Sequence, residues 1–205
     1  GLVVFSDEIY EKITYDGAEA INMATLTGDD VLCLTFSGLS KAYRVCGYRA
    51  GWVAITGPKK DASSYLAGIH MLASMRLCAN VPAQHAIQTA LGGYQSINEL
   101  VVPGGRLYEQ RTLAHKMLNE IDGISCTPAD GALYLFPKID IERFDITDDE
   151  QFALDLLKSQ KILFSHGGAF NWKDPDHFRL VYLPDTQTLT SALERLGNFM
   201  ADYKQ

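Results

Sequence analysis

The chain has 205 residues, of which 47% are hydrophobic and 21% charged, and these proportions are typical of a globular protein rather than a disordered one. Its formal net charge of −7 argues against nucleic-acid binding, which requires a basic face. No apolar run is long enough for a membrane-spanning helix, and the first residues lack the pattern of a signal or transit peptide. We therefore expect a globular protein with neither a nucleic-acid nor a membrane partner.

The cysteines and two of the histidines give no indication of a metal site. None of the 4 cysteines has a partner at the spacing of metal ligands, and their apolar or loop surroundings favour reduced thiols in a cytoplasmic protein. His166 and His177 likewise lack Cys or carboxylate partners at ligand spacing. The cysteines are Cys33, Cys46, Cys78 and Cys126.

The first predicted element is a buried strand that starts at about residue 3 and ends in the sequence Asp-Glu-Ile-Tyr at residues 7–10. The apolar run Val-Val-Phe at residues 3–5 favours this strand. It begins without a preceding cap, turn or methionine, whereas natural amino termini rarely open on a buried strand. We therefore expect the chain to be the carboxyl-terminal portion of a longer protein.

A second buried strand is predicted over residues 31–36, because this run is short, apolar and rich in strand-forming residues. It leads into a glycine-containing loop that carries Lys41, and a third strand is predicted over residues 52–55. Arg49 stands in the same loop, just before the third strand. This order suits a site in which an amine forms a covalent bond and a guanidinium binds a phosphate through two parallel hydrogen bonds.

Two motifs in this region resemble the class I/II aminotransferases, which are enzymes of fold type I. Residues 38–41 read Gly-Leu-Ser-Lys and residues 47–51 read Gly-Tyr-Arg-Ala-Gly, similar to that family's pyridoxal-phosphate attachment signature. Arg44 departs from the pattern, because a small residue is more common at its position. Residues 3–10, an apolar strand ending in Asp-Glu-Ile-Tyr, resemble the family's other cofactor segment. The resemblance covers essentially the whole chain.

The resemblance implies pyridoxal 5'-phosphate as the cofactor. Lys41 would bond covalently to the cofactor and later move a proton between the substrate α-carbon and the cofactor. Asp7 would face the pyridine nitrogen and keep it protonated, so that the ring accepts electrons. Tyr10 would donate a hydrogen bond to the phenolic oxygen of the cofactor.

The same resemblance assigns the cofactor phosphate to Arg49, together with Ser40 and Ser37. Each of the predicted cofactor residues also has an ordinary structural interpretation. A lysine after a serine is usually exposed to solvent, and an aspartate after a strand usually caps a turn or helix. A tyrosine at such a position usually packs at the rim of the core.

Two helices are predicted after the third strand. The first begins near Pro58, with this proline in its first turn, and ends near residue 78; the second is capped by Asn80 and ends at the glycines at positions 92 and 93. In the resembled family the loop between such helices approaches the neighbouring subunit's active site, so Arg76 and Asn80 are candidates for a site shared across a dimer. The alternative is a surface arginine and a capping asparagine. The expected buried face of the first helix consists of Tyr65, Ile69, Leu72 and Ala73.

The remaining segments predict a connecting helix and a small α+β region. Helices are expected over residues 106–119, after Thr147 as an N-cap, and over residues 186–203, with strands over residues 124–127 and 132–137. The expected fold class is α/β. By the resemblance, residues 1–104 would be the carboxyl-terminal part of a large cofactor-binding domain with a mostly parallel sheet, and residues 105–205 would form the connecting helix and a small carboxyl-terminal domain.

Residues 178–183, Phe-Arg-Leu-Val-Tyr-Leu, predict a strand with Arg179 inside it. A guanidinium in such a strand is costly unless it meets an anion. The segment resembles the part of the family's small domain in which an arginine pairs with the substrate α-carboxylate, which implies a substrate-binding role for Arg179. The alternative is an edge strand in which Arg179 pairs with Asp176 or another carboxylate.

Residues 40–45, 71–84 and 104–111 resemble the bacterial glutamate-pyruvate (alanine) aminotransferases. This resemblance implies a homodimer that transfers an amino group between alanine, or a similar amino acid, and the 2-oxo acid 2-oxoglutarate by a ping-pong mechanism. An aromatic or broad-specificity aminotransferase, a C–S lyase of the same fold and a non-catalytic aminotransferase-like sensor domain are the alternatives. On its own, the 205-residue chain is expected to bind the cofactor weakly and to turn over poorly.

Overall fold

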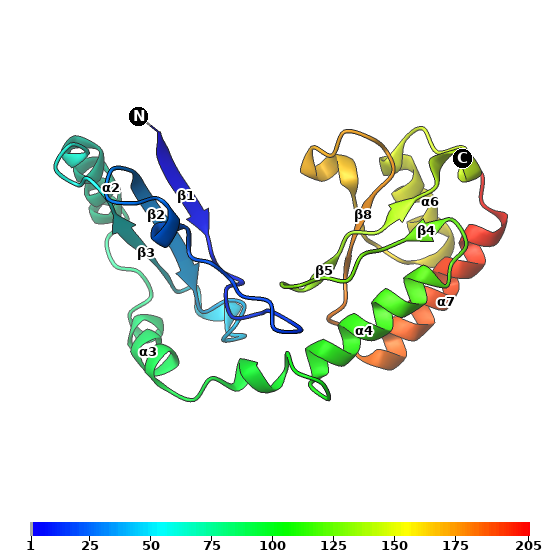
Figure 1. The fold of residues 1–205 in the computed structure, drawn as a ribbon, viewed down its shortest axis with the longest axis horizontal. Coiled ribbons are helices and arrows are strands. Elements are labelled where there is room, and N and C mark those ends of the chain that lie inside the picture. Colours follow the sequence, from blue (N-terminus) through cyan, green and yellow to red (C-terminus); the bar gives the residue numbers. More distant parts are fainter. Residues whose placement is uncertain (1) are drawn as a thin grey trace. The chain divides into compact units, whose positions relative to one another are not determined.

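The computed structural model describes residues 2–205 and has an α/β fold. The chain divides into two compact units, Gly1–Glu99 and Leu100–Gln205 (Figure 1), and each unit is described by itself. The domains expected from the sequence, residues 1–104 and 105–205, stay a prediction.

The first unit contains a three-stranded sheet in the order β1-β2-β3, formed by β1 (Val3–Asp7), β2 (Leu32–Gly38) and β3 (Gly51–Thr56). All three predicted strands are therefore present, but the expectation that the first is buried is wrong, because Val3 and Phe5 on β1 are 41% and 58% exposed. β1 and β2 are parallel, whereas β2 and β3 are antiparallel, so the described sheet is mixed. The first half of the central strand β2 is buried and anchors the sheet, as its apolar sequence indicates.

Short and long helices follow the strands of the first unit. They are α1 (Met23–Leu26), the 3-10 helix η1 (Cys46–Tyr48), α2 (Ser63–Arg76), α3 (Val81–Gly92) and the 3-10 helix η2 (Ser96–Glu99). Asn80 caps α3, as predicted, because its side chain accepts a hydrogen bond from the backbone N–H of Ala83 at 3.4 Å.

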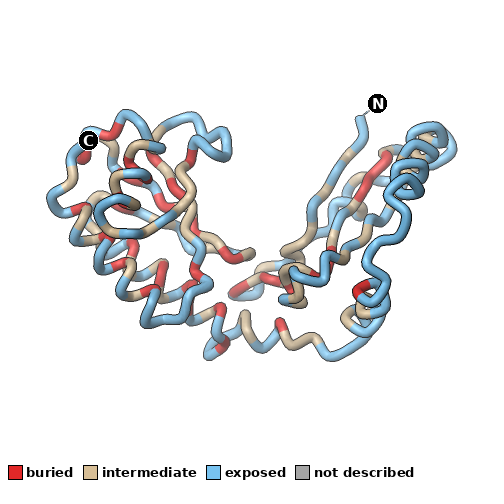
Figure 2. Tube along the Cα trace, turned by 180° about the vertical axis from the view of Figure 1, so that it is seen from behind, coloured by how far each residue is buried: buried red, intermediate tan, exposed pale blue. Residues whose placement is uncertain are grey.

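Helix α2 differs from the sequence-based expectation in two ways. It begins at Ser63, so Pro58 lies in a preceding turn and not in the first helical turn. The expected buried face is also wrong, because no residue of α2 is buried; Leu72 and Met75 are 67% and 73% exposed. Figure 2 shows this exposure along the helix. Apolar residues occur all around α2, and such a helix is normally covered in a complete assembly.

The second unit is built on two long helices that pack side by side, α4 (Arg106–Asn119) and α7 (Thr186–Asp202). Figure 1 shows them along one side of this unit. Their facing sides bury Ala114 and Leu118 on α4 and Leu193 on α7. The predicted helix over residues 106–119 is confirmed at both ends, and the predicted terminal helix is confirmed within one residue.

The strands of the second unit are short and form two sheets. One pairs β4 (Ile124–Ser125) with β6 (Lys138–Ile139), and the other has the order β5-β8-β7, from β5 (Tyr134–Leu135), β7 (Ser165–His166) and β8 (Phe178–Val181). The strands predicted over residues 124–127 and 132–137 are therefore shorter than expected. The first, β4, pairs with β6, and the second, β5, pairs with β8. All described pairs here are antiparallel.

Two further helices, α5 (Ile141–Phe144) and α6 (Asp149–Gln160), and the 3-10 helix η3 (Gly167–Phe170) complete the second unit. The prediction of Thr147 as the N-cap of α6 is wrong by one residue. Asp148 is the cap, because its Oδ1 accepts hydrogen bonds from the backbone N–H groups of Glu150 and Gln151 at 2.9 and 3.0 Å. A carboxylate at this position also interacts favourably with the helix dipole.

Aromatic rings fill the core between α6, α7 and β8. The ring of Phe152 on α6 lies 6.4 Å from that of Phe178 on β8 and 5.5 Å from that of Tyr203 after α7. Phe164 stacks on Phe178 with a centroid distance of 4.3 Å. This packing fixes β8, the central strand that carries Arg179. No helix among residues 2–205 is both long and apolar enough to cross a membrane.

Candidate active site

Asp7 is the last residue of β1, at the carboxyl end of the sheet edge that β1 shares with the parallel strand β2. Its side chain is exposed, and Oδ1 accepts a hydrogen bond from the backbone N–H of Ile9 at 3.2 Å. The turn that is usual for an aspartate after a strand is therefore present. It engages one carboxylate oxygen, and among the described residues no hydrogen bond to Oδ2 is observed.

Glu8 holds the segment that follows Asp7. Its Oε1 accepts hydrogen bonds from the backbone N–H of Met23 at 2.8 Å and from Ser6 Oγ at 3.1 Å, and Asn22 donates to Oε2. Burial raises the pKa of Glu8, but the hydrogen bonds from Asn22, Met23 and Ser6 outweigh it and lower the pKa below its ordinary value. The carboxylate thus ties α1 to the end of β1, a role that the sequence analysis missed.

The loop with Lys41 begins at the carboxyl end of β2 and is closed by backbone hydrogen bonds. Leu39 N–H donates to Ala50 at 3.1 Å, and Val45 N–H donates to the carbonyl of Leu39 at 3.2 Å. The side chain of Leu39 is fully buried, and so it anchors the loop. The Lys41 Nζ lies 5.5 Å from the centre of the Tyr10 ring, within reach of a cation–π contact.

The glycines of the signature permit a close approach of two backbone segments. Gly38 on β2 pairs with Gly51 on β3. A Cβ at Gly38 would lie 2.9 Å from the carbonyl oxygen of Ala50, and a Cβ at Gly51 would lie 2.8 Å from that of Ser37. Any other residue would therefore push the strands apart directly below the Lys41 loop.

Arg49 stands at the end of η1, in the left-handed backbone region with φ 51°. Its Nη1 donates to the carbonyl of Cys46 at 2.7 Å, and its side chain is exposed. Ser37 lies within β2 and Ser40 beside Lys41. Among residues 2–205, no hydrogen bond joins Arg49 to either serine.

Arg44, the residue that departs from the family pattern, also has a positive φ, at 58°. Its backbone N–H donates to Lys41 at 3.0 Å, and its Nη2 donates to Ser96 Oγ at 2.6 Å. The long side chain therefore connects the Lys41 loop to η2. Asn80 caps α3, which is the structural alternative expected for it, and its side chain also donates to the carbonyl of Tyr48 at 3.4 Å.

In the second unit, Arg179 lies on the central strand β8, opposite Ser165 on β7. Its guanidinium carbon is 4.5 Å from the ring centres of both Tyr134 and Phe170. The Nε atom is buried and has no hydrogen-bond partner. No carboxylate in the described part of the chain forms an ion pair with Arg179, and β8 is not an edge strand. The alternative of an arginine paired with Asp176 is therefore wrong.

Asp176 instead belongs to a separate cluster that sequence reasoning missed. Its Oδ1 is 2.6 Å from Nδ1 of His177 and accepts a hydrogen bond from the indole N–H of Trp172 at 2.8 Å, while Oδ2 is 3.3 Å from Lys138 Nζ. Burial of the carboxylate, which is 7% exposed, raises its pKa, but the bonds from His177, Trp172 and Lys138 lower the pKa below the ordinary value.

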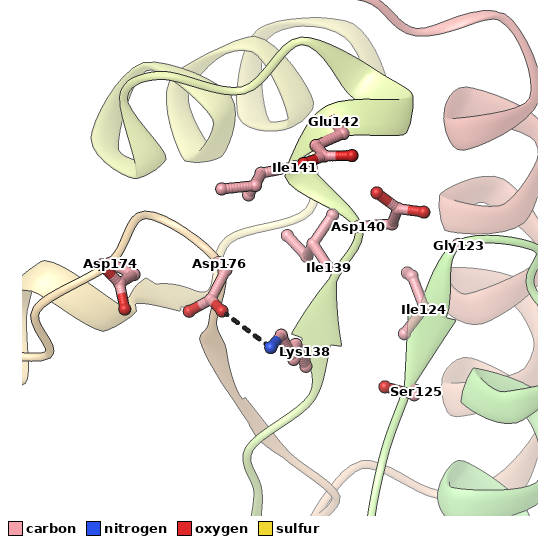
Figure 3. A pocket seen from close by; sticks show the side chains of 10 residues that line it. All are labelled: Gly123, Ile124, Ser125, Lys138, Ile139, Asp140, Ile141, Glu142, Asp174 and Asp176. Carbon is pink, nitrogen blue, oxygen red and sulfur yellow. Dashed lines mark ion pairs between the residues drawn. The ribbon is translucent and has the colours of Figure 1, made fainter.

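A hollow of about 520 Å³ lies beside this cluster (Figure 3). Its polar lining comes mainly from Lys138 and from the carboxylates of Asp140, Glu142, Asp174 and Asp176. None of the predicted cofactor or substrate residues lines it. Within residues 2–205 no three His, Cys, Asp or Glu side chains are placed to hold a metal ion.

Residues 1–196 match the family described as aminotransferase class I and II, and the chain belongs to this family. Enzymes of this family depend on pyridoxal 5'-phosphate. The predicted family resemblance is thus confirmed.

Two curated relatives are named an alanine aminotransferase and a glutamate-pyruvate aminotransferase. The chain is 62% identical to the alanine aminotransferase of Mycobacterium tuberculosis (strain ATCC 25618 / H37Rv) over 204 residues, which is 100% of this chain and 47% of that protein. It is 56% identical to the glutamate-pyruvate aminotransferase AlaA of Escherichia coli (strain K12), covering 100% of this chain and 50% of the relative. The chain therefore spans about half the length of the curated relatives that it matches.

Solved structures agree with this assignment. An aminotransferase from Escherichia coli superposes with a TM-score of 0.97 at 56% identity and covers 100% of this chain and 50% of its own. An alanine aminotransferase from Pyrococcus furiosus superposes with a TM-score of 0.90 at 39% identity, over 98% of this chain and 50% of its own. The fold is therefore that of the aminotransferases.

Proposed function

We propose that the enzyme containing this chain transfers an amino group between alanine and 2-oxoglutarate, with pyridoxal 5'-phosphate as its cofactor. The observation that carries the proposal is the common location of Asp7 and the Lys41 loop at the carboxyl ends of two paired parallel strands, with the Lys41 amine beside the Tyr10 ring. The names of relatives at 56% and 62% identity support alanine as the amino donor.

The residues present fit this cofactor. Gly38 and Gly51 hold the Lys41 loop against β3 at a distance that no side chain permits, and Asp7 keeps one carboxylate oxygen available in the same region. Lys41 would attach the cofactor, Asp7 would bind its ring nitrogen and Tyr10 its phenolic oxygen. Arg49, Ser40 and Ser37 would bind the phosphate, for which a guanidinium and hydroxyl groups are suitable donors.

When bound, pyridoxal phosphate supplies an electron-accepting ring that stabilises negative charge at the substrate α-carbon. The negative charge of Asp7 would hold a proton on the ring nitrogen, which keeps the ring electron-poor. The Lys41 amine would carry a proton to and from the substrate α-carbon. The Tyr10 ring beside Nζ would restrict where that amine moves.

Arg179 would bind the α-carboxylate of the amino acid and, in the second half-reaction, of the 2-oxo acid. A guanidinium binds a carboxylate through two parallel hydrogen bonds, which fixes the substrate orientation as well as its position. The absence of an ion-pair partner for Arg179 among the described residues supports this role. Within the family fold, the first unit would be part of the large cofactor-binding domain, and the second would be the connecting helix and the small α+β domain, with the boundary near residue 104.

The experiment uses the enzyme at its full natural length with alanine and 2-oxoglutarate. Pyruvate and glutamate should form in equal amounts, because a ping-pong reaction returns the cofactor to its starting state. Double-reciprocal plots should show the parallel lines of a ping-pong mechanism. Release of ammonia without glutamate would instead identify a lyase. A strong preference for tyrosine would identify an aromatic aminotransferase, and the absence of any turnover would favour a sensor domain.

A cytoplasmic homodimer is part of the same proposal. The exposed apolar residues of α2, Leu72 and Met75 among them, form a surface of the kind that usually lies in an interface. Replacing Leu72 by Glu should convert the dimer to a monomer in light scattering, whereas Ser64→Glu on the same exposed helix should not. A wild-type protein that is monomeric at micromolar concentration would contradict this part.

A further inference from the structure

The guanidinium of Arg179 contacts two aromatic rings that come from opposite sides of its strand. Tyr134 belongs to β5 and Phe170 to the end of η3, which follows β7, and the sheet order is β5-β8-β7. The Arg179 guanidinium carbon is 4.5 Å from each ring centre. Both distances lie within the range of cation–π contacts, for which arginine is the most frequent cation.

Ring contacts of this kind restrict the guanidinium without using its hydrogen-bond donors. The five N–H groups of arginine point outward in the plane of the group, whereas aromatic rings contact its faces. Nε of Arg179 is buried without a hydrogen-bond partner, and no described carboxylate pairs with the side chain. The donor edge therefore stays available to a planar anion, and a carboxylate matches it through two parallel hydrogen bonds.

The ring of Phe170 is itself held by a series of contacts. It meets Phe136 edge-on, with ring centres 6.4 Å apart and an interplanar angle of 81°. Phe136 meets Trp172 at 5.4 Å and stacks on His177 at 4.8 Å. Trp172 and His177 both bind the buried carboxylate of Asp176. Phe170 is thus supported, through Phe136, by a cluster with an anionic centre.

We propose that Tyr134 and Phe170 are positioning residues that hold the Arg179 guanidinium in the orientation required by the carboxylate of the substrate. This inference rests on the proposed function, since it assigns Arg179 to the carboxylate of the amino acid and of the 2-oxo acid. A cation that is already oriented loses less conformational entropy when the anion binds, and it places the substrate more accurately. The two rings would act through Arg179 and not on the reacting atoms.

The test is Phe170→Leu in the full-length enzyme, with Phe170→Tyr as the conservative variant. Phe170→Leu should raise the KM for both alanine and 2-oxoglutarate about three- to tenfold, the range expected from the loss of one partly buried cation–π contact, and should change kcat by less than twofold. Phe170→Tyr keeps a ring at this position and should restore the KM to near the wild-type value. Phe199→Leu, which removes a ring from the α7 side of the core, is the matched control and should leave KM unchanged.

A binding measurement tests the role of the two rings in carboxylate binding without any contribution from catalysis. Propionate has the carboxylate and methyl group of alanine but no amine, so its dissociation constant, measured by calorimetry, reports carboxylate binding without turnover. The constant should rise by the same factor as KM in Phe170→Leu. In the Arg179→Ala background, Phe170→Leu should have no further effect, because the ring acts through the guanidinium.

Two outcomes would overturn the inference. One is a dissociation constant for propionate in Phe170→Leu that equals the wild-type value. The other is a loss of propionate affinity on Phe170→Leu that is equally large with Arg179 and in the Arg179→Ala background. If Phe170→Leu fails to fold, the comparison of Tyr134→Leu with Tyr134→Phe gives the same test with the other ring. A wild-type enzyme that lacks transamination contradicts the proposed function instead, and propionate binding then still decides the role of the rings.

Discussion

The amine of Lys41 lies 5.5 Å from the centre of the Tyr10 ring, although the two residues belong to loops that follow different strands. Tyr10 follows β1 and Lys41 follows β2, and these strands are parallel. Loops that leave the carboxyl ends of paired parallel strands necessarily start at one edge of the sheet, which is where ligands of open α/β sheets bind. The strand pairing is therefore the physical cause of the candidate site.

The glycine at position 38 should be essential for stability. In Gly38→Ala the new Cβ would lie 2.9 Å from the carbonyl oxygen of Ala50, and a backbone atom cannot move away as a flexible side chain can. We expect the free energy of unfolding to fall by about 1–3 kcal/mol in urea titrations, the usual range for overpacking. Gly47→Ala is the control, because a Cβ there has no atom within 4 Å. Equal stability of the two variants would refute the close packing of β2 and β3.

The N-cap of α6 gives a direct comparison of neighbouring residues. Asp148→Ala removes the side chain that accepts from Glu150 and Gln151, so it should cost about 1 kcal/mol of unfolding free energy. Thr147→Ala removes only an exposed hydrogen bond to Gln205 and should cost less than about half as much. Thermal melts of the two variants decide between them, and a larger loss in Thr147→Ala would restore the cap that the sequence first suggested.

The carboxylate of Asp176 should contribute a pH-dependent part of the stability. Its pKa in the folded protein is below its ordinary value of 3.8, so the contribution is complete above the unfolded-state pKa and declines as the pH falls through the folded-state pKa. Asp176→Asn should therefore be less stable than the wild type at pH 7, and the difference should shrink below about pH 4. A difference that stays constant from pH 7 to pH 3 would show that the ionised form is not the stabilising one.

Local sequence patterns predicted the existence of several strands and helices. The strands around Val4, Leu34 and Val53 and the helix over residues 106–119 follow from apolar runs, helical periodicity and nearby glycine and proline. The order of Asp7, Tyr10 and Lys41 along the chain also placed the candidate cofactor residues on two neighbouring strand ends. Their roles stay predictions, since neither the fold nor the relatives' names test single side chains.

Features that depend on distant partners could not be predicted in this way. The carboxylate of Asp176 pairs with Lys138 from a distant segment, and Glu8 reaches Met23 across a loop. The rings beside Arg179 likewise meet it only through the pairing of β8 with two strands. The predicted buried face of α2 is wrong for another reason. An apolar sequence predicts that a helix is covered, but not which other part of the protein covers it.

The covalent attachment of the cofactor is the central claim, and peptide mapping tests it most directly. The full-length enzyme is loaded with pyridoxal phosphate, the bond between amine and cofactor is reduced with borohydride, and the labelled peptide is sequenced by mass spectrometry. The label should lie on Lys41, should disappear in Lys41→Ala and should persist in Lys12→Ala, and Lys41→Ala should lower transamination at least about 100-fold. A label on any other lysine, or a Lys41→Ala enzyme with full activity, would contradict the account.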